Sequence, residues 1–129
     1  MGINLLNIET DVPFRKNLSR HLRLKQCNVY ETDQRIKVKK ILKRKKIDVV
    51  LLGLIGFKQE GLSILRMIKK MRPFTEVIII NHSEQIALSI EGMKLGAFYD
   101  FIVPFDLESL VRLIREAYQK KIQNEKAKK

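Results

Sequence analysis

The sequence predicts a single α/β domain in which a parallel sheet lies between two layers of helices. Five short β-competent segments alternate with five longer segments of helical periodicity along 129 residues. Two of the short segments, residues 48–52 and 77–80, are continuously apolar apart from Asp48, as in strands covered on both faces. Strands that alternate with helices of about ten or more residues indicate βαβ crossovers, so we expect a doubly wound, three-layer domain.

The boundaries of these elements follow from local residue types. Asp11 is a candidate N-cap and Pro13 suits a first helical turn. Pro73 breaks the third helix, Gly96 ends the fourth, and Asp106 caps the last one. The expected strands are residues 3–8, 28–31, 48–52, 77–80 and 98–103. The expected helices are residues 12–24, 34–45, 59–71, 83–95 and 107–121.

The chain length and composition suit one domain with a hydrophobic core. The apolar content of 45% supplies that core, and we expect the domain to span residues 1–121. Residues 122–129 are polar and rich in lysine, which predicts a flexible tail or linker. The start of the chain lacks the pattern of a signal peptide, and no segment is apolar for long enough to insert into a membrane. One cysteine, Cys27, excludes an internal disulfide, so we expect a cytoplasmic protein.

The net charge of +12 is unevenly distributed. Residues 15–46 hold 13 lysines and arginines against only Glu31 and Asp33. Such asymmetry favours an acidic partner, which could be a nucleic acid, an anionic surface or an acidic protein. A solvated helix face is the simpler interpretation of a charge run, and both stay open. The candidate polyanion-binding residues are Lys39, Lys40, Lys43 and Arg44.

The functional site of a doubly wound domain is expected at the carboxyl ends of its strands. The residues that follow or end the expected strands there are Glu9, Thr10, Gly53, Asn81 and Val103. Glu9 and Asp11 could be the remnant of a metal site. The favoured interpretation is that these two residues are an N-cap and a solvated loop acid. Gly53 and Gly56 could cradle a ligand, but no glycine-rich phosphate motif surrounds them, which favours a simple turn.

Four segments carry a resemblance to a known family. They are residues 11–18, residues 47–52 followed by Gly61 and Leu62, residues 91–97, and residues 104–110. With them, the chain from residue 3 to about residue 118 resembles the receiver domain of response regulators. The resemblance implies a flavodoxin-like fold with strand order 2-1-3-4-5. It also implies a cis peptide bond between Val103 and Pro104.

The functional positions depart from the family's pattern. The resemblance implies two acidic Mg²⁺ ligands where Glu9 and Thr10 stand, and a phosphoacceptor aspartate at Gly53. It implies a switch Ser/Thr at Asn81, a switch aromatic residue at Asp100 and a lysine at Val103. Phosphoryl transfer to a carboxylate needs the carboxylate, a divalent ion and a cation against the developing charge. We therefore expect neither an enzyme nor a bound metal or cofactor, but a pseudo-receiver that works independently of phosphorylation.

A protein-binding face is implied by the resemblance. Receivers form dimers and contact output proteins through the fourth helix, fifth strand and fifth helix of the fold. We therefore expect a protein partner or a second copy of the chain to bind there. The residues at these positions are Ile90, Lys94, Tyr99, Phe101, Arg112, Arg115 and Tyr118.

Two other sites are weighed against this interpretation. An enzyme of flavodoxin-like architecture would bind flavin, and no catalytic motif supports it. His21, Cys27 and His82 lack the spacing of metal ligands. The pseudo-receiver therefore stands as the main hypothesis, with polyanion binding as its alternative.

Overall fold

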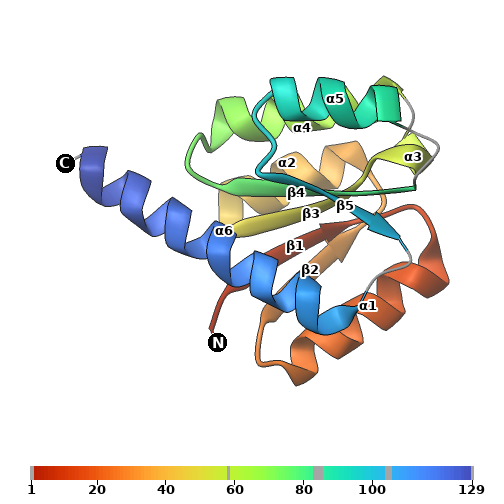
Figure 1. Cartoon of the computed structure of the whole chain (residues 1–129), viewed down its shortest axis with the longest axis horizontal. Helices are drawn as coiled ribbons and strands as arrows, with labels where there is room; N and C mark the ends of the chain where they lie inside the picture. Colours follow the sequence, from red (N-terminus) through yellow and green to blue (C-terminus); the bar gives the residue numbers. More distant parts are fainter. Residues whose placement is uncertain (1, 58, 83–85, 104–105, 129) are drawn as a thin grey trace.

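The computed structural model describes residues 2–57, 59–82, 86–103 and 106–128, and its strands and helices alternate along the chain (Figure 1). The strands are β1 (Asn4–Ile8), β2 (Asn28–Thr32), β3 (Val49–Gly53), β4 (Glu76–His82) and β5 (Tyr99–Val103). The helices are α1 (Val12–Leu24), α2 (Arg35–Arg44), α3 (Leu54–Phe57), α4 (Gln59–Met71), α5 (Ile86–Lys94) and α6 (Leu107–Lys128).

The five strands form one parallel sheet in the order β2-β1-β3-β4-β5. Helices α1 and α6 cover one face of this sheet, and α2, α4 and α5 cover the other (Figure 1). The predicted fold class and strand order are therefore confirmed. Because all strands are parallel, their carboxyl ends lie at one edge of the sheet, where Glu9, Gly53, Asn81 and Val103 are found.

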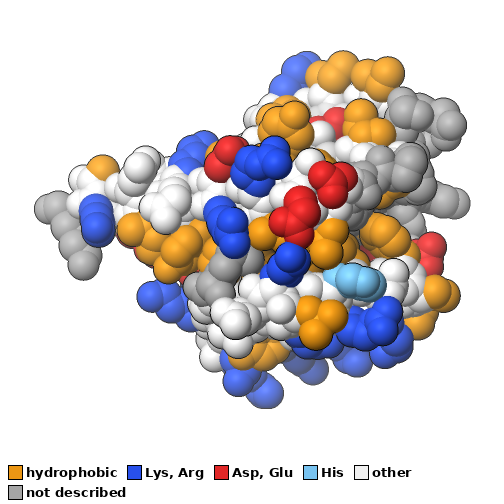
Figure 2. Space-filling view, turned by 60° about the horizontal axis from the view of Figure 1, so that its bottom comes forward, with side chains coloured by type: hydrophobic (Ala, Val, Ile, Leu, Met, Phe, Trp, Pro, Cys, Tyr) orange, Lys and Arg blue, Asp and Glu red, His pale blue; other side chains and the backbone are white. Residues whose placement is uncertain are grey.

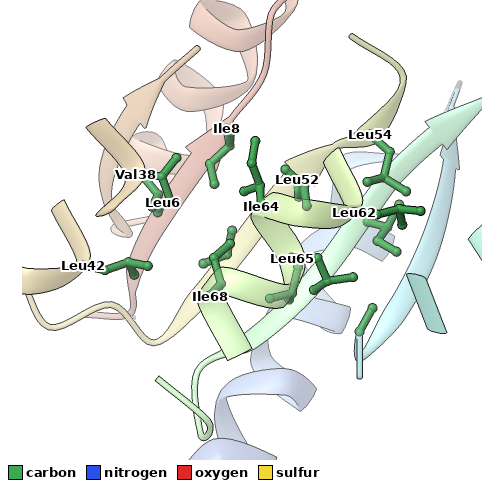
Figure 3. Close-up of a cluster of buried hydrophobic side chains, with 14 of the residues drawn as sticks. Leu6, Ile8, Val38, Leu42, Leu52, Leu54, Leu62, Ile64, Leu65 and Ile68 are labelled. Atoms are coloured by element: carbon green, nitrogen blue, oxygen red, sulfur yellow. The ribbon is translucent and has the colours of Figure 1, made fainter. Parts of the chain in front are cut away.

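Two hydrophobic cores lie on opposite faces of the sheet, because successive strand residues point to opposite sides. Leu6 of β1 and Leu52 of β3 pack with α2 and α4, as Figure 3 shows. Their sequence neighbours Leu5 and Leu51 pack instead with α1 and α6. This double coverage explains why β3 and much of β4 are continuously apolar in the sequence.

The predicted helix boundaries at Asp11 and Gly96 are confirmed. Asp11 accepts a hydrogen bond from the backbone N–H of Phe14 at 3.1 Å, which caps α1. Gly96 follows α5 with a φ of +103°, a conformation that suits glycine. Residues 83–85, which were expected to begin this helix, and Pro104, for which a cis bond was expected, lie outside the described residues.

Two elements differ from the prediction. Residues 54–57 form the short helix α3, where a simple turn was expected after β3. Helix α6 continues to Lys128, whereas the predicted helix ended near Lys121 and a flexible tail was expected beyond it. The reason is a buried contact: Lys121 lies against the sheet and also pairs with Glu125 one turn later, which supports the added turns.

Candidate functional site

A cavity of about 740 Å³ lies at the carboxyl ends of β1, β3, β4 and β5. It occupies the predicted place for a ligand site in a doubly wound domain. Its described lining brings together five of the six residues predicted to be degenerate phosphorylation positions. The lining residues are Glu9, Thr10, Asp11, Phe14, Asn17, Leu18, His21, Gly53, Gly56, Ile80, Asn81, Val103 and Leu107.

Two glycines in the cavity wall are each matched to a side chain from the loop after β1. A Cβ atom at Gly53 would overlap the carboxylate of Glu9, and one at Gly56 would overlap the hydroxyl of Thr10. The space in which a side chain at position 53 would begin is thus filled by Glu9. The close approach of Glu9 and Thr10 accounts for the lack of a side chain at both positions.

The residues at this edge do not fit the Mg²⁺ ion that receivers bind. Gly53 has no side chain, and Glu9 Oε2 accepts a hydrogen bond from the backbone N–H of Asp11 at 3.0 Å. In the part of the chain that the structure describes, no three acidic, histidine or cysteine residues form a cluster that could hold a metal. Of the three positions where receivers place acids around Mg²⁺, Thr10 and Gly53 supply no carboxylate and only Glu9 does.

Asn81 connects the cavity with helix α5. Its side chain is fully buried, and its Nδ2 donates a hydrogen bond to the hydroxyl of Ser89. Ser89 lies on α5 and is also buried. The residue at the predicted switch position therefore points inward and ties the end of β4 to α5.

Asp100, the sixth of these positions, lies apart from the cavity. It lines a second hollow of about 460 Å³ between α5 and β5. Its Oδ1 atom is buried and has no hydrogen-bond partner among the described residues. The remaining lining residues are Ile86, Ser89, Ile90, Met93, Lys94 and Ile102. A buried carboxylate oxygen without a hydrogen bond is energetically costly. Asp100 Oδ1 therefore lacks a hydrogen-bond donor among the described residues of this hollow.

The predicted protein-binding residues are divided between two sides of β5. Ile90 and Lys94 line the hollow on the α5 side. Tyr99 is 49% exposed and its ring lies 6.5 Å from that of Phe101, which packs toward the core shared with α6. On α6, Arg112 and Arg115 are exposed, and Tyr118 packs partly against the same core.

The prediction missed three apolar residues of the hollow. Ile86, Met93 and Ile102 are 64%, 42% and 47% exposed. The sequence carried a weak indication of these exposed residues. Helix α5 has apolar residues on both of its sides, and a helix with one buried face needs them on one side only. Together they form a candidate contact surface beside Asp100.

The candidate polyanion-binding residues lie together on α2 and all are exposed: Lys39, Lys40, Lys43 and Arg44. None of the ion pairs of the described residues involves them. Figure 2 turns the α1–α6 side forward and shows lysine and arginine side chains gathered along the lower edge of the molecule. The basic charge is therefore available at the surface.

Three residues considered as metal ligands are separate or undescribed. Cys27 is buried just before β2, and burial raises the pKa of its thiol. His21 lies on α1, where its Nδ1 contacts the carbonyl oxygen of Asn17 at 2.8 Å. The side chain of His82 lies outside the described residues. No helix within the described ranges has the length and apolar character needed to cross a membrane.

Comparison with known proteins agrees with this geometry. The family model for the response regulator receiver domain matches residues 5–115. An NtrX-like response regulator of Rickettsia felis is 31% identical over 118 residues, which cover 89% of this chain and 25% of that protein. A second, from Rickettsia bellii, is 41% identical over 81 residues, which cover 60% of this chain and 17% of that protein. This chain thus spans about a quarter or less of these relatives.

Solved structures show the same fold. A response regulator receiver domain protein of Clostridium thermocellum is 26% identical, has a TM-score of 0.86, and covers 94% of this chain and 98% of its own. NtrX of Brucella abortus, in complex with ADP, has a TM-score of 0.90 at 18% identity, over 99% of this chain and 29% of that one. From its sequence match, strand order and site position, this chain belongs to the response regulator receiver domain family of two-component signalling.

Proposed function

We propose that this receiver domain is a pseudo-receiver: it signals without phosphorylation, by binding a partner protein at the hollow between α5 and β5. Gly53 supports the first part, because it lacks the carboxylate that a phosphodonor would modify. Val103 adds no cation that could stabilise a phosphoryl group. Domains of this family bind partner and output proteins, which gives the second part its context.

The observation that carries the proposal is Asp100. Its Oδ1 atom is buried, without a hydrogen-bond partner in the described part of the chain, in a hollow whose rim exposes Ile86, Ile90 and Ile102. A partner segment with apolar side chains and one N–H donor would cover the apolar surface and satisfy the carboxylate. Both effects favour binding, because apolar burial releases water and a hydrogen bond to a charged group contributes about 1.5–3 kcal/mol.

Site-specific photo-crosslinking in cells tests the protein-binding part of the proposal. A crosslinking residue at Ile86 should yield a discrete adduct, and Ile90→Arg should abolish it by placing charge on the rim. Ile36 of α2 is the matched control, because it is 65% exposed against 64% for Ile86. Equal adducts at both positions, or an adduct that persists in Ile90→Arg, would contradict the proposed surface.

A second candidate function is binding of a polyanion through α2. It is supported by four exposed basic residues, Lys39, Lys40, Lys43 and Arg44, that have no ion-pair partner among the described residues. Binding to duplex DNA should weaken with salt, and each lost phosphate contact should lower the log–log slope by about 0.9. Replacing all four with Gln should reduce the slope, whereas an unchanged slope would leave α2 as a solvated face.

A further inference from the structure

We propose that the cavity at the carboxyl ends of β1, β3, β4 and β5 binds a small organic cation with an apolar body, such as an aryl-alkyl amine. The proposal goes beyond the docking function above, because this cavity and the α5–β5 hollow share no lining residue among those that the structure describes. A volume of about 740 Å³ lies within the range of small-molecule sites, roughly 300–1,000 Å³.

The cavity exists because small residues stand where the strands end. Gly53 and Gly56 contribute no side chain to its wall, and Val103 contributes a short apolar one. Glu9 and Thr10 fold against the two glycines, which leaves the remaining space open toward α1 and α6. The described lining of the cavity thus comes from six elements, α1, β3, α3, β4, β5 and α6, and from the loop after β1.

Apolar side chains form the side of the cavity that faces α1 and α6. They are Phe14, Leu18, Ile80, Val103 and Leu107. A ligand of matching shape gains about 25 cal/mol for each Å² of apolar surface that it buries. The apolar walls therefore require a ligand with a hydrophobic body and exclude a bare inorganic ion.

Charge in the described wall selects a cation. Glu9 and Asp11 contribute carboxylates, and no lysine or arginine is among the described lining residues. Glu9 is half-buried, so its carboxylate is screened less than a fully exposed one. His21 Nδ1 faces the carbonyl of Asn17 at 2.8 Å, which makes it the donor and leaves Nε2 as an acceptor in the neutral ring. An amine would meet acceptors on several sides of the cavity.

One side chain of the cavity wall also connects it to α5. Asn81 lines it, and the same side chain donates its hydrogen bond to Ser89, which lines the α5–β5 hollow. A ligand that contacts Asn81 should therefore perturb amide resonances of α5 as well as those of the cavity. This gives a spectroscopic readout that does not depend on any activity of a longer protein.

The test is an NMR titration of the ¹⁵N-labelled chain with three probes of similar size: 2-phenylethylamine, 2-phenylethanol and 3-phenylpropionate. The amine should shift resonances of Thr10, Leu18 and Asn81 and bind at least about tenfold more tightly than the alcohol, a ratio worth 1.4 kcal/mol. The acid should bind most weakly. Equal binding of all three probes would overturn the proposal, as would no shifts at the cavity with millimolar amine.

Two variants of the cavity wall and one control variant distinguish recognition of the amine's charge from nonspecific apolar binding. Glu9→Gln keeps an oxygen that can accept from Asp11 but removes the charge, so the amine should weaken about tenfold and the alcohol should not change. Glu116→Gln, on the exposed face of α6, is the matched control and should change neither. Val103→Lys places a cation in the wall and should also abolish amine binding. Retention of amine affinity in Glu9→Gln and Val103→Lys would contradict the proposed site.

Discussion

Lys121 of α6 donates a hydrogen bond from its ammonium group to Asp48, 73 residues earlier in the chain, at 3.0 Å, and both side chains are buried. The other oxygen of Asp48 accepts from the backbone N–H of Asn4 at 2.9 Å. One carboxylate thus joins the starts of β1 and β3 to the last part of α6. The same ammonium pairs with Glu125, so the added turns of α6 depend on this contact.

Replacing Lys121 with Met should destabilise the domain by about 3–5 kcal/mol, because Asp48 would keep a buried charge without its cation. Chemical denaturation measures this loss. Lys126→Met, on the same helix, is the matched control and should cost less than about 1 kcal/mol, because Lys126 is exposed and forms no ion pair with the other described residues. Equal losses in the two variants would show that the buried pair has no special role.

The Lys121 contact should also give a defined response to pH. Burial acts to lower the pKa of Lys121, but hydrogen bonds and charges from Asp48 and Glu125 outweigh it and raise the pKa above its usual value of 10.5. The contribution to stability is therefore complete at neutral pH and is lost only as pH rises through the folded-state pKa. Below pH 10, Lys121 should stay protonated. Deprotonation of Lys121 should therefore not reduce the difference in free energy of unfolding between the native chain and Lys121→Met.

Glu31 predicts a stability change on the acid side. Burial acts to raise the pKa of Glu31, but hydrogen bonds from Arg15 and Ser19 and the charges of Lys16 and Arg15 lower it overall, below 4.5. Its contribution is therefore present above pH 4.5 and is lost as pH falls through the folded-state pKa. Glu31→Gln should destabilise by about 1–2 kcal/mol at pH 7 and by progressively less as the pH falls below 4.5. Denaturation curves at the two pH values check this, and a constant difference would refute it.

Gly61 predicts a packing effect between α3 and α4. A Cβ atom there would lie 2.8 Å from Cδ2 of Leu54 and 3.2 Å from its carbonyl oxygen. In Gly61→Ala, this close contact should lower the free energy of unfolding by about 1–3 kcal/mol. The higher helix propensity of Ala should offset about 1 kcal/mol of that loss. Ser63→Ala, on the same helix and half-buried, should change stability little. A Gly61→Ala variant more stable than the native chain would contradict the close contact.

The native chain should not form an aspartyl phosphate at position 53, and Gly53→Asp should also fail to become a normal switch. The new carboxylate would compete with Glu9 for the same space, and two adjacent carboxylates repel. Thr10 adds no third acid for Mg²⁺, and Val103 cannot pair with a phosphoryl oxygen. Mass spectrometry after treatment with a small phosphodonor and Mg²⁺ checks both chains. A stoichiometric acyl phosphate on the native chain would refute the pseudo-receiver proposal.

The sequence by itself determined the order of strands and helices along the chain. Burial on both faces of the sheet leaves local apolar patterns in β3 and β4, which are visible in the sequence. It also determined the caps at Asp11 and Gly96, since capping depends on residues only a few positions apart. The resemblance to receivers added the strand order and the position of the site.

Only the tertiary structure decided the features that join distant residues. Lys121 was expected only to end the last helix, and the structure brings it against Asp48. Glu9 was expected to be a loop acid, and the end of β1 brings it against Gly53. The position of Asp100 on the α5 side of β5, with a buried oxygen that no described residue pairs with, likewise depends on packing between elements. Periodicity encodes which face of an element is buried, but the identity of the side chain that meets that face is set by contacts between distant parts of the chain.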